Sequence, residues 1–197
     1  MKVKEHPDYP RFESAMRTVA ANHVLSWAGV VYRSAPPKWA AGRDMLTGAG
    51  SMKAGGRFNA AGSFPVVYCS ATPELAMIES LAFQRRAGLP VERAMPLVFK
   101  AISVQVQRLL DLTDTNVLVA FAVTADQLLT DAWWQARLRG EESLTQAVGR
   151  AAHANGVQAL RVASAHSADH GHNLLLLPDH IAPPSELKVL RHPRSGR

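Results

Sequence analysis

Hydrophobic and polar positions divide the first half of the chain into two helices separated by short strands and a glycine-rich loop. Between Pro10 and Trp27, apolar residues recur at three- and four-residue intervals, which predicts an amphipathic helix that Gly29 ends. The apolar run Val30–Arg33 predicts a short strand, and a second strand is predicted over Val66–Ser70. The segment between them, residues 40–56, contains five glycines and predicts a long functional loop.

The second helix is predicted from its start signals. Thr72 is a good N-cap, Pro73 suits the first helical position and Glu74 is favourable in the first turn, so the helix should run from Pro73 to about Arg86. Glu79 lies within it, and its neighbours three and four residues away are all apolar: Leu75, Ala76, Ala82 and Phe83. A carboxylate on such a stripe requires a cationic or hydrogen-bonding partner. A structural ion pair and a position at the edge of the stripe are the alternative interpretations.

The second half of the chain contains short elements of both kinds. Apolar patterns predict strands over 96–106, 158–163, 174–177 and 187–190, and helices that begin at Ala125 and Ser143. The apolar run 117–123 fits a strand or a helix, and 131–140 is predicted to be partly helical. Six or seven short strands and four helices, without strict alternation, predict an α+β fold with mainly antiparallel sheets and flanking helices.

Composition supports a single globular domain. Hydrophobic residues make up 47% and charged residues 19% of 197 residues, which is enough for one substantial core. No apolar run approaches the roughly 20 residues that span a bilayer, so no membrane association is expected. The first residues, MKVKEHPDYP, lack the apolar core of a signal peptide, and a cytoplasmic protein is therefore expected.

The net charge of +6 raises the possibility of a nucleic-acid partner. The basic residues are scattered, however, and their main cluster is the tail Arg191–Arg197. This distribution disfavours sequence-specific DNA binding and favours an acidic partner or substrate. The single cysteine, Cys69, excludes an internal disulfide and is predicted to be buried in a strand.

Four polar residues stand where a cleft could gather them: Arg33, Arg57, Glu79 and Ser164. Arginine forks suit a pyrophosphate or a carboxylate, and Arg57 follows glycines that permit close backbone approach. Taken one at a time, each of these residues could equally be an ordinary surface or turn residue.

A histidine-rich loop suggests two other chemistries. His166, His170 and His172 have a spacing that could reach one zinc ion, but no cysteine completes the set and no metal is expected. Ser164 beside a histidine and an aspartate suggests a hydrolase, although the G-x-S-x-G elbow is lacking.

Three motifs in order resemble the RES domain, the toxin half of bacterial RES–Xre toxin–antitoxin pairs. They are VYRSAPP, GGRFNAAGSFPVVYCSATPELAMIES and ALRVASAHSADHGHNLLLLP, and together they span Val30 to Pro178. The arginine, glutamate and serine that name the family fall on Arg33, Glu79 and Ser164. The family's G-G-R-W-N motif is present here as GGRFN, with Phe58 in place of tryptophan.

The resemblance implies a fold like that of ADP-ribosyltransferase toxins, in one RES-like domain over 1–197, with an N-terminal helical extension (1–28) and a basic tail (191–197). It implies a bacterial type II toxin that consumes NAD as its substrate by cleaving the nicotinamide–ribose bond. Such an enzyme is an NAD glycohydrolase, an NAD phosphorylase or an ADP-ribosyltransferase, depending on whether the acceptor is water, phosphate or a protein side chain. The implied partner is an Xre-type antitoxin, and DNA binding is expected only through it.

The resemblance also implies roles for particular residues. Glu79 would stabilise an oxocarbenium-like state, Arg33 and Arg57 would hold the pyrophosphate, Tyr68 would pack on a ring, and Ser164 would orient Glu79 or bind the ribose. The implied catalytic residues are Glu79, Arg33 and Ser164. The implied NAD-binding residues are Arg33, Gly56, Arg57, Asn59, Tyr68, Ser164 and Asn173.

The chain departs from the family pattern at two further places. Val162-Ala163-Ser164 replaces the usual V-P-S, and no tyrosine lies between Arg33 and Gly55, where many members have one. These departures keep open a module that binds NAD or another nucleotide without turnover. A hydrolase that uses Ser164 or a metal on the histidine loop is the third alternative.

Overall fold

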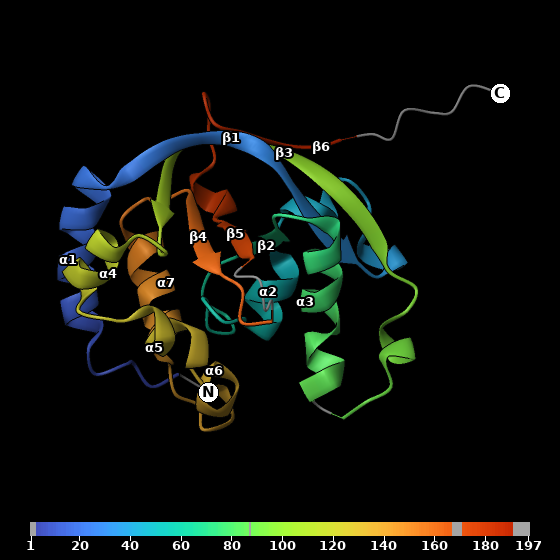
Figure 1. Ribbon diagram of the computed structural model, residues 1–197, viewed down its shortest axis with the longest axis horizontal. Coiled ribbons are helices and arrows are strands. Elements are labelled where there is room, and N and C mark those ends of the chain that lie inside the picture. The colour runs from blue at the N-terminus through green and yellow to red at the C-terminus, as the bar shows by residue number, and fades with distance from the viewer. Residues whose placement is uncertain (1–2, 87, 167–170, 191–197) are drawn as a thin grey trace.

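The computed structural model describes residues 3–86, 88–166 and 171–190 (Figure 1). The strands are β1 (Val24–Ala35), β2 (Val67–Ser70), β3 (Val98–Asp111), β4 (Ala159–Ala163), β5 (His172–Leu176) and β6 (Glu186–Val189). The α-helices are α1 (Tyr9–Asn22), α2 (Ala49–Ala54), α3 (Pro73–Arg86), α4 (Thr115–Phe121), α5 (Ala125–Thr130), α6 (Trp133–Leu138) and α7 (Leu144–Ala154). Short 3-10 helices are η1 (Pro37–Trp39), η2 (Asp44–Leu46), η3 (Val91–Ala94) and η4 (Pro178–His180).

Five strands close into a ring. Their order is β1-β2-β5-β4-β3, and β3 pairs back onto β1, while β6 adds to the other edge of β3. The β3–β4 pairing is parallel and the remaining pairings are antiparallel. The α+β class is therefore confirmed, but the barrel is mixed rather than plainly antiparallel. Four helices lie between β3 and β4, and this long crossover allows the two strands to run in the same direction.

Strand β1 is much longer than the predicted Val30–Arg33, and β3 continues to Asp111, beyond the predicted end at Val106. The two strands pair from Val24–Leu110 to Ala35–Val98 and arch across the top of the molecule in Figure 1. The helix expected to reach Trp27 ends at Asn22, so the end of the predicted N-terminal helical extension already belongs to β1. Val24 and Trp27 fit the apolar spacing of a helix, but pairing with β3 satisfies their backbone groups as a strand.

Two apolar clusters lie on opposite sides of the strands. One cluster draws residues from all five strands of the ring, including Val31, Val67, Ile102, Ala159 and Leu174. The other packs α1, α4 and α7 against the alternate positions of β4 and β5, such as Leu160 and Leu175. Successive side chains of a strand point to opposite faces, so β4 and β5 contribute to both clusters. The helix α3 packs separately, against β1 and β2.

Helix caps resolve the segments that the sequence left open. The run 117–123 is mostly helix α4, because the Asp114 carboxylate caps its start by accepting from Asn116 N. Capping boxes begin α5 at Thr124 and α7 at Ser143, so Thr124 is the cap that the sequence suggested and Ser143 precedes its helix rather than beginning it. The loop 40–56 contains η2 and α2. Of the helices in the described ranges, none is long and apolar enough to cross a membrane.

Candidate active site

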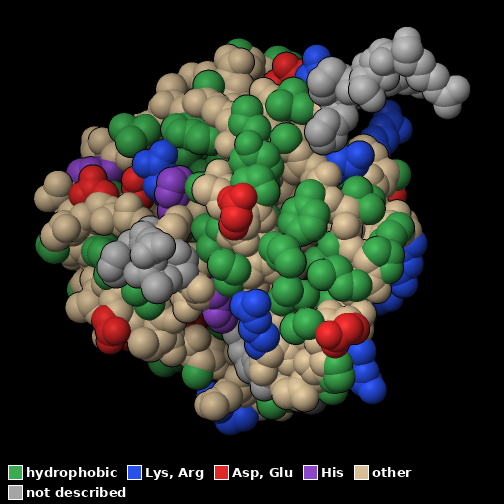
Figure 2. All heavy atoms as spheres, turned by 45° about the vertical axis from the view of Figure 1, so that its right-hand side comes forward, with side chains coloured by type: hydrophobic (Ala, Val, Ile, Leu, Met, Phe, Trp, Pro, Cys, Tyr) green, Lys and Arg blue, Asp and Glu red, His purple; other side chains and the backbone are tan. Residues whose placement is uncertain are grey.

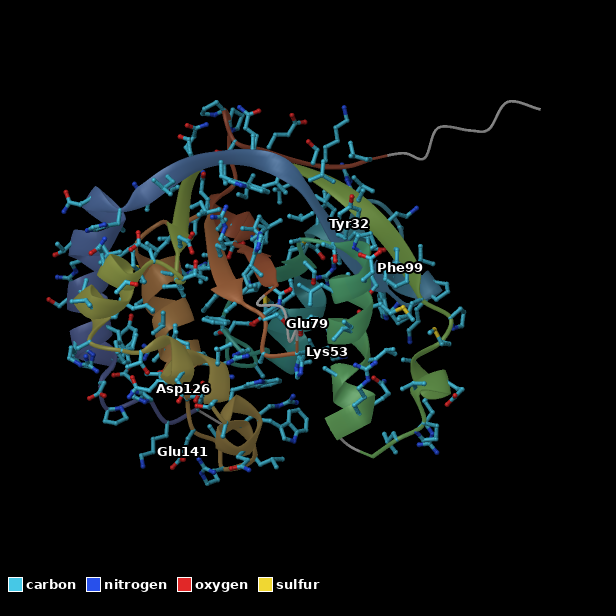
Figure 3. All side chains as sticks on the ribbon, in the orientation of Figure 1. Tyr32, Lys53, Glu79, Phe99, Asp126 and Glu141 are labelled. Carbon is cyan, nitrogen blue, oxygen red and sulfur yellow. The ribbon has the colours of Figure 1, made fainter. Side chains whose placement is uncertain are left out.

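Glu79 is held by donors from two neighbouring strands. One carboxylate oxygen, Oε1, accepts from Ser164 Oγ at 2.6 Å and from Asn173 Nδ2 at 2.7 Å. Ser164 directly follows β4 and is buried, and Asn173 lies in β5. The Asn173 side-chain oxygen in turn accepts from Ser70 Oγ at the end of β2, at 2.8 Å. Residues in or next to three strands thus fix the position of the carboxylate. Glu79 itself belongs to α3, and its label lies near the centre of the view in Figure 3.

The second carboxylate oxygen of Glu79 faces His166. His166 Nε2 lies 4.0 Å from Glu79 Oε2, and the His166 backbone N–H donates to Ser164 Oγ at 3.1 Å. In the described part of the chain, no arginine or lysine forms an ion pair with Glu79. The interpretation of Glu79 as half of a structural arginine pair is therefore not supported there. Its side chain is 28% exposed, so solvent or a ligand can reach it.

Arg33 offers a buried positive charge at the cleft. Its Nη1 donates to the Tyr68 carbonyl at 2.9 Å, while its buried Nε has no hydrogen-bond partner among the described residues. Burial lowers the pKa of the Arg33 guanidinium, because it disfavours the charged form. No carboxylate of the described chain pairs with it. An anionic ligand would therefore offset the cost of burying this cation.

A buried network fixes the ring of Tyr68. The Tyr68 hydroxyl donates to Asn59 Oδ1 and accepts from Phe58 N, both at 2.9 Å, and burial raises the pKa of the phenol. Asn59 Nδ2 donates to two backbone carbonyls. At Gly56, a Cβ would lie 2.5 Å from the Tyr68 hydroxyl oxygen, so only glycine permits this approach without displacement.

A cleft of about 350 Å³ brings most of the predicted residues together. It is lined by Arg33, Gly56, Arg57, Tyr68, Glu79 and Asn173, with others. Ser164 does not line it but reaches it through Glu79. Asn59 is fully buried and does not line it either, so it acts on the cleft through residues that do, namely Tyr68, Gly56 and Ser51, to which it is hydrogen-bonded. The prediction that these residues bind NAD stays a prediction.

Sequence reasoning missed other residues of the cleft. Ser34 and Ser80 line it, and their hydroxyls hydrogen-bond to each other, linking β1 to α3. Trp133 and His166 also line it. In the sequence, the histidines near Ser164 suggest metal ligands or part of a hydrolase, although the position of His166 two residues after Ser164 is a signal that could have placed it near Glu79.

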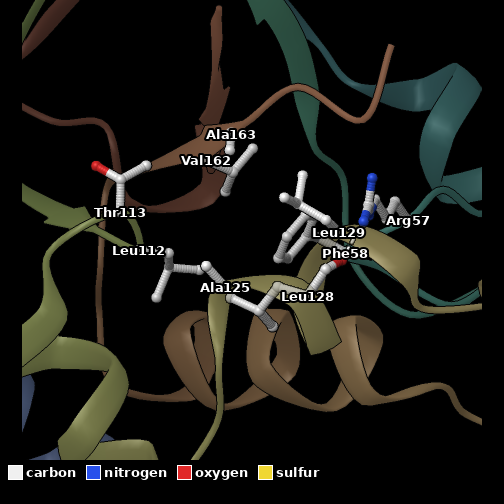
Figure 4. Close-up of a pocket in the computed structure, with 9 residues that line it drawn as sticks. All are labelled: Arg57, Phe58, Leu112, Thr113, Ala125, Leu128, Leu129, Val162 and Ala163. Atoms are coloured by element: carbon white, nitrogen blue, oxygen red, sulfur yellow. Dashed lines mark hydrogen bonds between the residues drawn. The ribbon is translucent and has the colours of Figure 1, made fainter. Parts of the chain in front are cut away.

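Arg57 also borders a second, much smaller pocket (Figure 4). Its volume is about 80 Å³, and its lining is mostly apolar, with Phe58, Leu128 and Val162. The Arg57 guanidinium donates to the Leu128 carbonyl, which ties the arginine to α5. The pocket is too small for a nucleotide. It shows that α5 helps to fix the position of the Arg57 guanidinium.

The alternative chemistries receive little support from the geometry. The Ser164 hydroxyl donates to a carboxylate, whereas a serine hydrolase requires it to donate to an imidazole. Over 3–86, 88–166 and 171–190, no three His, Cys, Asp or Glu side chains gather as a metal site. His170 lies outside the described residues, so the absence of a metal stays a prediction.

Cys69 is buried against the cleft, and burial raises the pKa of its thiol to about 12.

Comparison with known proteins gives a consistent set of similarities. The sequence model of the RES domain matches residues 30–194. The NAD(+) phosphorylase MbcT of Mycobacterium tuberculosis is 28% identical over 150 residues, covering 74% of this chain and 74% of that protein, and the Mycobacterium bovis protein of the same name matches equally. The crystal structure of the M. tuberculosis MbcT-MbcA toxin-antitoxin complex aligns with a TM-score of 0.69 at 21% identity. That alignment covers 92% of this chain and 90% of the other chain.

Proposed function

The chain belongs to the RES domain family, and from this premise we propose that it is an NAD-degrading toxin of a bacterial type II toxin–antitoxin pair. It breaks the N-glycosidic bond between nicotinamide and ribose. The observation that carries the proposal is the Glu79 carboxylate, anchored through one oxygen and open through the other, in a cleft that also contains two arginines. The 28% identity to an NAD(+) phosphorylase supports the same substrate.

Glu79 acts on the charge that develops as the bond breaks. Cleavage passes through an oxocarbenium-like state at the ribose, which a fixed carboxylate stabilises electrostatically. Ser164 and Asn173 hold Oε1, so the carboxylate needs no reorganisation during the reaction. The electron pair of the broken bond returns to the ring nitrogen of nicotinamide. The leaving group therefore departs neutral and needs no general acid.

The remaining residues bind and position the dinucleotide. Arg33 and Arg57 hold the pyrophosphate, since guanidinium forks match phosphate oxygens. Two observations on Arg33 support this role: its Nε has no hydrogen-bond partner among the described residues, and burial lowers its pKa. A bound anion would stabilise the charged guanidinium. Tyr68 offers a ring for stacking, Gly56 keeps the backbone close to it, and Asn59 orients its hydroxyl. Ser164 and Asn173 are positioning residues for Glu79.

The acceptor that we propose is phosphate. A phosphate oxygen bonds to the ribose carbon as the bond to nicotinamide breaks, which yields a phosphorylated ADP-ribose and neutral nicotinamide. The MbcT relatives are NAD(+) phosphorylases, which supports this choice. Water, which would make the protein a glycohydrolase, and a protein side chain, which would make it an ADP-ribosyltransferase, are the other acceptors to be tested.

We also propose an antitoxin partner that covers the cleft, an Xre-type protein in the cytoplasm, where NAD is available. The fold's likeness to a chain of a toxin–antitoxin complex supports a partner of this kind. The net charge of +6 favours an acidic partner surface. Figure 2 shows hydrophobic side chains gathered on the face that turns forward, and exposed apolar residues in and near α3 and β3 include Met77, Met95 and Phe99.

Incubation of the purified protein with NAD tests the proposal. The expected result is loss of NAD with release of nicotinamide, and a phosphorylated ADP-ribose as the second product when phosphate is present, identified by mass spectrometry. Phosphate-free buffer and an added protein acceptor separate the three reactions. NAD binding without turnover would support the non-catalytic alternative and overturn the proposal.

A further inference from the structure

His166 is a cleft residue beside Glu79 that the proposed mechanism does not yet use. Its imidazole is 32% exposed, and it lies in the loop that follows β4, whereas Glu79 lies in α3. Its backbone N–H bonds to Ser164 Oγ, so the same hydroxyl that orients Glu79 also fixes the start of the histidine loop. The position of His166 relative to the carboxylate is therefore tied to the catalytic geometry.

The cleft contains one more group that can be positively charged than the pyrophosphate uses, and this group is available to a second anion. Three cleft-lining side chains of the described residues can carry a positive charge, namely Arg33, Arg57 and His166. The proposed function assigns both arginines to the pyrophosphate. A phosphate acceptor that approaches Glu79 carries negative charge toward a carboxylate, which costs free energy unless a nitrogen donor lies beside it. His166 can supply this donor, because its Nε2 lies 4.0 Å from Glu79 Oε2 at the edge of the cleft.

The spacing between His166 and Glu79 suits a bridging oxygen. The 4.0 Å between Nε2 and Oε2 is too long for a direct hydrogen bond, but an oxygen atom about 2.8 Å from each fits between them. Such an oxygen must accept from the imidazole N–H and donate to the carboxylate. Water and the hydroxyl of hydrogen phosphate can both do this, but hydrogen phosphate also leaves its other oxygens available to react while the hydroxyl bridges the two side chains.

We propose that His166 binds the acceptor phosphate beside Glu79 and so selects phosphate over water; the proposal rests on the proposed NAD phosphorolysis. A phosphate oxygen forms the new bond to the ribose carbon, the bond to the nicotinamide nitrogen breaks, and its electron pair leaves with nicotinamide. Hydrogen phosphate keeps its proton throughout, so no base is consumed. Water at the same place would have to release a proton, which makes phosphate the better acceptor where an imidazole supplies binding and no residue acts as a base.

Steady-state kinetics with inorganic phosphate as the varied substrate test the proposal. His166→Leu removes the ring nitrogens and keeps an apolar side chain of similar size. We expect the KM for phosphate to rise about tenfold or more, as for the loss of a hydrogen bond to a charged group, with the KM for NAD within about twofold of the original. The share of ADP-ribose among the products should rise, and His166→Lys should recover part of the phosphate affinity. The matched control is His172→Leu, because His172 is exposed on β5 and does not line the cleft.

The outcomes separate this proposal from the one on which it rests. An unmodified protein that consumes NAD only with phosphate, together with a His166→Leu variant of unchanged KM for phosphate, overturns the role of His166 alone. An unmodified protein whose NAD consumption does not depend on phosphate overturns both phosphorolysis and the assignment of His166. Equal effects of His166→Leu on both KM values indicate a structural role and also overturn the assignment.

Discussion

The variant Glu79→Gln tests whether the Glu79 carboxylate is needed for catalysis or for folding. Glu79→Gln keeps an oxygen that can accept from Ser164 and Asn173, and removes the negative charge. We expect NAD consumption to fall on the order of 10²- to 10³-fold, as for other lost electrostatic contacts in a transition state. The thermal midpoint should change little, because no arginine or lysine of the described chain loses an ion-pair partner. The rate of NAD loss and the thermal midpoint are measured on the same preparation.

Glu74→Gln provides the matched control for this change. Glu74 lies in the first turn of the same helix, is exposed and does not line the cleft, so its variant should keep the full rate. If Glu79 were a structural residue, Glu79→Gln would instead cost roughly 3–5 kcal/mol of stability, as when one partner of a buried ion pair is removed. A Glu79→Gln variant that melts early yet retains its rate per folded molecule would contradict the catalytic role.

Among the elements, α7 positions the turn that presents Arg57. Thr145 Oγ1 donates to the Arg57 carbonyl at 2.6 Å, and Gln146 Nε2 donates to the Gly56 carbonyl at 2.9 Å. One turn further along α7, a Cβ at Gly149 would lie 1.9 Å from the Phe58 carbonyl oxygen. Gly149→Ala must therefore separate the helix from the turn. We expect a loss of about 3 kcal/mol in the free energy of unfolding, measured by denaturant titration, with reduced NAD consumption.

Gly50→Ala is the control for this element. Gly50 lies in α2, and a Cβ there would meet no atom within 4 Å. Alanine should stabilise the protein by about 0.4–1 kcal/mol, because it reduces the conformational freedom of the unfolded chain. A Gly149→Ala variant as stable as the Gly50→Ala variant would show that α7 does not pack on the turn as described.

For the whole molecule, the pH dependence of stability follows in part from His180, and His172 contributes in the same direction because burial lowers its pKa too. Burial lowers the pKa of the His180 imidazole in the folded chain, the charges of His153 and Arg108 lower it further, and the hydrogen bond to the His153 carbonyl and the charge of Asp179 oppose them. The unfolded chain then binds the proton more readily. This contribution to stability is complete above about pH 6.5, the ordinary histidine value, and is lost progressively as the pH falls below it. Thermal midpoints measured from pH 8 to pH 5 should fall, and His180→Gln should flatten the curve. His23→Gln changes an exposed histidine and should leave the curve as it is.

The antitoxin prediction also belongs to the whole molecule, because it concerns a surface made by several elements. We expect the purified complex of this chain with its antitoxin to consume NAD far more slowly than the free chain, because the partner covers the cleft. Met77→Ser, in the exposed part of α3, should weaken the complex, whereas Val119→Ser, on α4, should not. Binding would be measured by calorimetry. A complex that turns over NAD at the full rate would contradict this prediction.

The sequence by itself determined the elements whose signals are local. It predicted α3 with the bounds that the structure has, Pro73–Arg86, because an N-cap, a proline and an apolar stripe lie within a few residues of one another. It also placed Glu79 on that stripe and Ser164 at the end of a strand. The three residues that name the family could be recognised because each lies in its own short motif.

Only the tertiary structure decided which groups meet. Asn173 is 94 positions from Glu79 in the chain, and the two come together because β2, β4 and β5 are neighbours in the closed ring. Val24 and Trp27 became strand because pairing with β3 outweighed an apolar spacing that also fits a helix. Asn59 contacts the Tyr68 hydroxyl, and His166 lies beside the Oε2 atom of Glu79. Such contacts between side chains depend on strand order and register, which no local pattern of residues specifies.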